Sequence, residues 1–287
     1  MNNSKKLALD ALAKALWLRK QLGIKLDESV SPIDSAERLG VEVRLVDLPS
    51  MEGIYTAGGT KNIFLSSLRP QGRRSFTCAH ELGHHVFGHG DQFDELATEK
   101  TPMRQRDPKE FSADCFAAYF LMPKATVDNG LKRRGLVYAS LGAVDVYRLA
   151  SWLGVGYRTL INHLLYGLRA IPREQASHLL REEPRMIRRH ILGQGTEGNL
   201  HVVDEHWLGR AIDCEVGDIV LFPKAVEMEG YQFIEQKNIL DKKVFKVIRP
   251  GIMRASIRTS VWSAFIRVSP SSYVGRSCFR FEEEVNE

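Results

Sequence analysis

The sequence feature that most constrains the fold is the short segment H-E-x-x-H at residues 80–84. In an α-helix, His80 and His84 lie one turn apart on the same face, so their two imidazoles can bind one tetrahedral metal ion. Glu81 follows the first histidine and can take a proton from a water that attacks a carbonyl. The segment therefore predicts a helix, a metal ion and a hydrolytic reaction.

The residues around this motif favour a metal site over a surface helix that is merely rich in histidine. Leu82 and Val86 provide an apolar face, and Gly88 is typical of a helix end. His85 points about 100° away from its neighbour His84, and His89 lies beyond the glycine. We expect both to be ordinary solvated or helix-end histidines.

A second predicted helix, which begins at Pro108 and ends at Pro123, supplies a third ligand. Glu110 lies in its first turn and Asp114 four residues later on the same face. Glu110 can bind metal, and Asp114 can accept a hydrogen bond from a ligating histidine. Alternatively, both carboxylates only cap and solvate the first turn. Four further acidic residues compete for the ligand position: Asp91, Asp94, Glu95 and Glu99.

Together the two segments resemble the ImmA/IrrE metallopeptidase family. The second helix in that family carries E-x-x-A-[ND]-x-F-A and ends in L-M-P, as the residues from Glu110 to Pro123 do here. The likeness runs from about Ser31 to Pro123, and it shows no departure at the metal positions. It implies a zincin-like peptidase domain.

The resemblance also implies the roles of the site residues and the substrate. The implied metal ligands are His80, His84 and Glu110, with Glu81 as catalytic base and Asp114 as the partner of a ligating histidine. Zinc is the default for this donor set, and Mn²⁺ or another divalent metal also suits it. The implied substrate is a helix-turn-helix repressor of the XRE type, whose cleavage induces a stress response to DNA damage or radiation.

The 287 residues suffice for two or three domains. The layout of the whole chain resembles the deinococcal radiation-response proteases of this family, which implies an α+β, multidomain fold. We expect a zincin-like metallopeptidase domain at 1–125, a helix-turn-helix-like helical domain at 126–192 and a GAF-like α+β sensor domain at 193–287. The third domain implies an unknown small-molecule or other signal.

Periodicity predicts the elements of the first domain. Helices are expected at 6–22 and 31–40, a strand at 41–46 and a hairpin at 54–66. The hairpin offers an edge strand that could pair with an extended substrate peptide. The polar segment 91–107 is predicted to be a loop.

Residues 145–164 resemble a helix-turn-helix, with Gly154 at the turn. The second helix is expected to expose Arg158, Thr159, Asn162 and His163, and arginine and asparagine are residue types that contact base edges. A helical linker that packs on the protease also explains the pattern, and we favour it over direct DNA binding. The net charge of +5 is only weak evidence for nucleic-acid binding.

No apolar run approaches the length of a membrane span, and no signal core follows the N-terminus. The four cysteines are far apart and form no CxxC pair, which indicates reduced, packed thiols. We therefore expect a cytoplasmic protein. Two rival functions remain open: a DNA-binding transcriptional activator whose His-Glu site is structural, and a ligand-gated sensor or scaffold.

Overall fold

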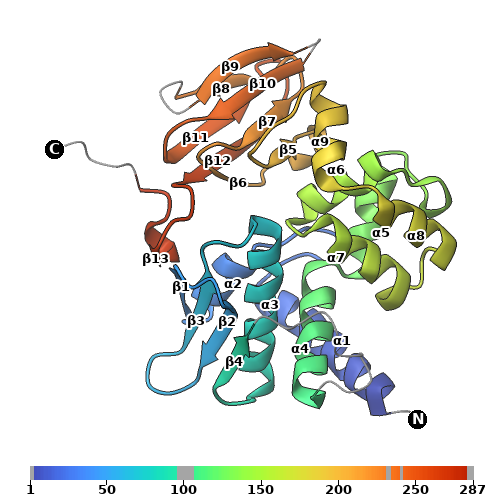
Figure 1. Ribbon diagram of the computed structural model, residues 1–287, viewed down its shortest axis with the longest axis vertical. Coiled ribbons are helices and arrows are strands. Elements are labelled where there is room, and N and C mark those ends of the chain that lie inside the picture. The colour runs from blue at the N-terminus through green and yellow to red at the C-terminus, as the bar shows by residue number, and fades with distance from the viewer. Residues whose placement is uncertain (1–2, 96–106, 231–233, 240–241, 283–287) are drawn as a thin grey trace.

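The computed structural model describes residues 3–95, 107–230, 234–239 and 242–282 and combines α-helices with three small sheets (Figure 1). Its mixed helix and strand content agrees with the predicted class. In the described ranges, no helix combines the length and apolar character that a lipid bilayer requires.

Three helices form the frame of the N-terminal part. Helix α1 (Asn3–Gln21) packs on α4 (Pro108–Leu121), and α4 packs on α3 (Gln71–Phe87). Helix α4 begins where predicted, because Asp107 accepts a hydrogen bond from the Lys109 amide and Pro108 occupies the first turn. Its phenylalanines Phe116 and Phe120 are fully buried. The helix is therefore held from both sides, which fixes the position of Glu110 near its start.

A five-stranded sheet lies beside α3 in the order β13-β1-β3-β2-β4 (Figure 1). Strands β1 (Glu42–Val46) and β3 (Asn62–Ser66) are parallel, whereas β2 (Met51–Thr56) forms the predicted antiparallel hairpin with β3. Helix α2 (Pro32–Arg38) precedes β1 and is capped by the Ser31 hydroxyl, as the sequence indicated.

Two strands of this sheet were not predicted. The segment expected to be a loop contains β4 (Gln92–Glu95), which pairs with β2, and β13 (Gly275–Arg276) pairs with β1 from the far end of the chain. Residues 96–106 of the expected loop lie outside the described residues. Because β2 is bonded on both sides, the prediction that the hairpin offers a free edge is wrong, and the edge strand is β4.

The middle of the chain is helical. Its elements are α5 (Lys124–Arg133), α6 (Ala143–Leu153), α7 (Tyr157–Asn162), a π-helical turn (His163–Gly167), α8 (Arg173–Arg181) and α9 (Pro184–Leu192). Gly154 ends α6 in the left-handed conformation with φ of 72°, which is a common end of helices in general. His163 was expected to be exposed but is buried, and its Nε2 lies 2.8 Å from the Met122 carbonyl oxygen. Burial lowers the pKa of His163 to about 4, so this side chain is a neutral core group.

The C-terminal part consists of two four-stranded sheets. One has the order β5 (Leu200–Val202), β7 (Ile219–Phe222), β10 (Lys242–Val247), β9 (Ile234–Ile239). The other has the order β6 (Ile212–Glu215), β12 (Ser263–Ser269), β11 (Gly251–Ser256), β8 (Glu227–Glu229). Within the described residues from 200 to 282 there is no α-helix, so the prediction of an α+β domain for this segment is wrong. The grouping of these strands into two sheets depends on contacts between distant segments, which local sequence patterns do not specify.

Ion pairs join the N-terminal and C-terminal parts. Asp34 of α2 accepts hydrogen bonds from Arg267 at 2.9 Å and from Arg280 at 3.1 Å, and Arg74 of α3 pairs with Glu215. A Cβ atom on Gly72 would lie 2.7 Å from the Gly156 nitrogen. The backbone of α3 therefore also packs closely against the backbone of the turn between α6 and α7. The first turns of α2 and α3 are thus the meeting point of all three parts of the chain.

Candidate metal centre

Two histidines and one glutamate converge between α3 and α4. The Nε2 atoms of His80 and His84 are 3.0 Å apart. Glu110 places its carboxylate oxygens 3.2 Å from His80 Nε2 and 3.4 Å from His84 Nε2. Both histidines are buried, and the glutamate is partly buried. The predicted set is therefore brought together within the spacing that one metal ion requires.

The outer nitrogens of both histidines are also held. His80 Nδ1 lies 3.0 Å from Asp114 Oδ1. Because an ionised carboxylate can only accept, Nδ1 donates, and Nε2 keeps the lone pair that a metal needs. His84 Nδ1 lies 2.9 Å from His89 Nδ1, so His89 orients the imidazole of His84. His89 thus lies at the helix end, which was one of the two expectations for it, but it contacts His84 rather than only solvent.

Gly88 adopts φ of 68° and turns the chain back over the last turn of α3. This left-handed conformation brings His89 against His84, with the two ring centroids 5.0 Å apart. In the sequence, the only signal for this contact was Gly88 directly before His89. By itself, that glycine predicts only where the helix ends. His85 is likewise not free, because its Nδ1 lies 2.8 Å from the Tyr55 hydroxyl.

Gly83 within the motif lets the two helices approach each other. A Cβ atom there would lie 3.2 Å from the Ala113 Cα and 3.1 Å from the Phe116 ring. The small residues Gly83 and Ala113 therefore face each other where α3 and α4 pack. This close approach brings Glu110, which lies one turn before Ala113, within reach of the histidines.

Glu81 is completely buried next to His80 in the chain, and β2 lies against it. A Cβ atom on Gly53 would collide with Glu81 Oε1 and would lie 2.5 Å from Thr77 Cγ2. Gly53 thus lets the strand pass closely over the Glu81 side chain, a feature that sequence analysis missed. Its only signal was a glycine at a strand position, which often marks close approach.

We expect Gly53→Ala to lower the free energy of unfolding by roughly 1–3 kcal/mol and to reduce cleavage, because the added methyl displaces Glu81 or the strand. Gly58→Ala is the matched control, since a Cβ there meets nothing within 4 Å. Urea unfolding and a cleavage assay on both variants test this. Equal behaviour of the two variants would contradict the proposed close approach.

Asp114→Asn is expected to weaken metal binding by about 10–100-fold, because the amide keeps a hydrogen-bond acceptor but loses the charge that supports His80. Competition with a chromogenic chelator measures the affinity. Asp128→Asn on α5 is the control, since that carboxylate binds Lys124 rather than a histidine. An unchanged metal affinity of the Asp114→Asn variant would show that Asp114 serves only the helix and does not support His80.

Among the side chains that the structure describes, none of the other acidic candidates near the motif competes for the ligand position. Asp91 accepts a hydrogen bond from the Ala57 amide at 2.7 Å. Glu99 and the side chains of Asp94 and Glu95 lie outside the described residues. Cys78 is fully buried in the core, as predicted, and burial raises the pKa of its thiol.

Comparison with known proteins identifies the domain that carries this site. The IrrE N-terminal-like domain of the Peptidase_M78 family matches residues 36–164. These residues belong to that family. The matched region begins in α2, ends in the π-helical turn and contains His80, Glu81, His84 and Glu110. The family assignment confirms the ImmA/IrrE resemblance, supports a metallopeptidase and fits a zincin-like fold.

Other comparisons add little to the family assignment. A search of curated proteins found no match. Among solved structures, a Mycobacterium tuberculosis transcriptional regulator matches with 15% identity and a TM-score of 0.37. The match covers 57% of this chain and 52% of that one, so the chain spans about half the length of that structure.

Proposed function

We propose that this protein is a zinc-dependent endopeptidase that cleaves a helix-turn-helix repressor of the XRE type and thereby induces a response to DNA damage or other stress. The observation that carries the proposal is the convergence of His80, His84 and Glu110 on one point inside a Peptidase_M78 domain. The deinococcal radiation-response layout, with boundaries near residues 125 and 192, and the cytoplasmic location stay predictions.

The donor set fits a catalytic rather than a purely structural metal. Two imidazoles and one carboxylate are typical of zinc peptidases, whereas a structural zinc site is closed by four protein ligands. Within the described residues, the cluster contains three such ligands. A bound divalent metal would supply Lewis acidity toward the scissile carbonyl and lower the pKa of water. Zinc is the default, and Mn²⁺ suits the same ligands.

Glu81 would carry the proton transfers. It lies directly after the first ligand on α3 and is buried, so its carboxylate is shielded from bulk water. It would accept a proton from the attacking water and return it to the amine of the leaving peptide. Asp114 and His89 would keep the imidazoles of His80 and His84 oriented during the reaction. The edge strand β4, rather than the hairpin, would pair with the extended substrate.

The test uses the purified chain and an XRE-type repressor. After chelation, the protein is incubated with the repressor with and without added Zn²⁺ or Mn²⁺, and fragments are identified by mass spectrometry. Discrete fragments that need both the chain and the metal support the proposal and locate the scissile bond. Cleavage without metal would contradict the metal-dependent mechanism. Absence of fragments together with regulation of transcription with an intact repressor would favour the DNA-binding activator instead.

A further inference from the structure

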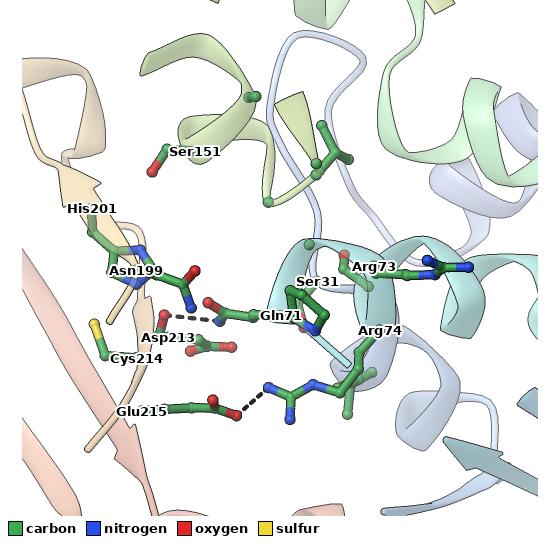
Figure 2. A pocket seen from close by; sticks show the side chains of 18 of the residues that line it. Ser31, Gln71, Arg73, Arg74, Ser151, Asn199, His201, Asp213, Cys214 and Glu215 are labelled. Carbon is green, nitrogen blue, oxygen red and sulfur yellow. Dashed lines mark hydrogen bonds and ion pairs between the residues drawn. The ribbon is translucent and has the colours of Figure 1, made fainter. Parts of the chain in front are cut away.

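A cavity of about 810 Å³ lies where the three parts of the chain meet. Its walls come from the first turn of α3, the α6–α7 turn, α9 and strands β5 and β6. Figure 2 shows Gln71 and Arg74 of α3 on one side, facing Asn199, Asp213 and Glu215 of the C-terminal part. Ligand sites for small molecules have volumes of this size and often form between domains.

Arginine dominates the charged lining, with seven arginines against four carboxylates. Most of these carboxylates are already neutralised. Glu215 pairs with Arg74, and Asp34 and Asp213 pair with Arg267 and Arg280. Glu197, the fourth, is exposed.

Three arginines of the lining have no ion-pair partner within the described part of the chain: Arg158, Arg188 and Arg210. The cavity therefore carries excess positive charge.

Four buried donors of the cavity lining have no hydrogen-bond partner in the described structure, and one of them is Nε1 of Trp207. The other three are Nη1 of Arg210, Nε of Arg188 and the hydroxyl of Ser151. These three come from three different segments of the chain, namely the loop before β6, helix α9 and helix α6. Buried donors are normally satisfied, so four of them lining one cavity indicate a missing acceptor.

Arg210 is held rigidly for such a role. Its guanidinium lies over the rings of Trp207 and Trp152, 4.9 Å and 5.7 Å from their centroids. Burial lowers its pKa to about 9, which still leaves it charged at neutral pH. A planar guanidinium fixed between two indoles presents its remaining N–H groups in one direction, as anion recognition requires.

Part of the remaining lining is apolar. Tyr147, Leu200, Val155 and Trp207 contribute aromatic and aliphatic surface beside the arginines. A bare inorganic anion would leave most of this surface without contact. The arginines and the apolar surface together suit a molecule with one strongly anionic group and a larger, less polar body.

We propose that this cavity binds a small phosphate-bearing molecule of about mononucleotide size, with its phosphate on Arg188, Arg210 and Ser151. A phosphate offers several acceptor oxygens to donors that approach from different segments, whereas a carboxylate offers two. The bound molecule would bridge the peptidase domain and the C-terminal sheets at the start of the helix that carries the metal ligands. This site does not depend on peptidase activity.

Isothermal titration of the full chain with adenosine 5′-monophosphate, adenosine and inorganic phosphate tests the proposal. We expect the nucleotide to bind at least about tenfold more tightly than the nucleoside, because the charge-assisted hydrogen bonds belong to the phosphate. Inorganic phosphate is expected to bind weakly and to compete with the nucleotide. Absence of binding by both phosphate probes, or equal binding of nucleotide and nucleoside, would overturn the proposal.

Matched variants locate the site. Arg188→Gln is expected to weaken nucleotide binding about tenfold, whereas Arg189→Gln, next to it on α9 but exposed and outside the cavity, leaves binding unchanged. Ser151→Ala removes one unpartnered hydroxyl with little risk to folding and is expected to weaken binding severalfold. Equal affinities for the Arg188, Arg189 and Ser151 variants would place any nucleotide elsewhere.

Discussion

Glu81→Gln is expected to bind metal normally and to lose cleavage of the repressor by about 10²–10⁴-fold, the usual contribution of a general base. The substitution keeps the shape of a fully buried side chain and leaves His80, His84 and Glu110 untouched. An amide cannot accept the proton of the attacking water at neutral pH. The loss should therefore fall on the chemical step.

Three measurements on the same preparation separate this role from a structural one. Metal content by mass spectrometry and the thermal unfolding midpoint should match those of the unchanged protein, while the rate of fragment formation falls. A Glu81→Gln protein that cleaves at the normal rate would refute the proposed mechanism. A variant that loses metal as well would show that Glu81 supports the site rather than the reaction.

Glu110→Ala is expected to reduce metal affinity by on the order of 100-fold or more, since loss of an outer partner alone costs about 10–100-fold. The glutamate lies 3.2 Å and 3.4 Å from the two ligand nitrogens and is the acidic member of the cluster. Without it, two neutral imidazoles would have to hold a divalent cation. Cleavage should then require metal concentrations far above those that saturate the unchanged protein.

The control for this experiment is Asp10→Ala, which removes a carboxylate from the exposed face of α1. Metal affinity is measured by chelator competition, and cleavage is followed across a range of Zn²⁺ concentrations. Partial recovery of cleavage at high Zn²⁺ by Glu110→Ala supports its role as a ligand. Unchanged metal affinity would instead support the alternative in which Glu110 only caps and solvates the first turn of its helix.

Much of the metal site could be predicted because it depends on local periodicity. His80 and His84 are neighbours on any helix, as are Glu110 and Asp114 on theirs, so each pair is set by spacing alone. The prediction that Glu110 meets His80 and His84 required the family resemblance, because no local rule states which carboxylate meets which histidine. Packing at Gly83 and Ala113 is the physical reason that they meet.

The sequence by itself indicated the helices and the hairpin of the N-terminal part and the spacing of His80 with His84 and of Glu110 with Asp114, because hydrophobic period, capping residues and i, i+4 spacing are local properties. Tertiary structure alone decided the contact of His89 with His84, the close passage of Gly53 over Glu81 and the burial of His163. It also decided that β13 joins the first sheet and that the C-terminal strands form two sheets. These features depend on contacts between residues distant in the chain, whose partners no local pattern specifies.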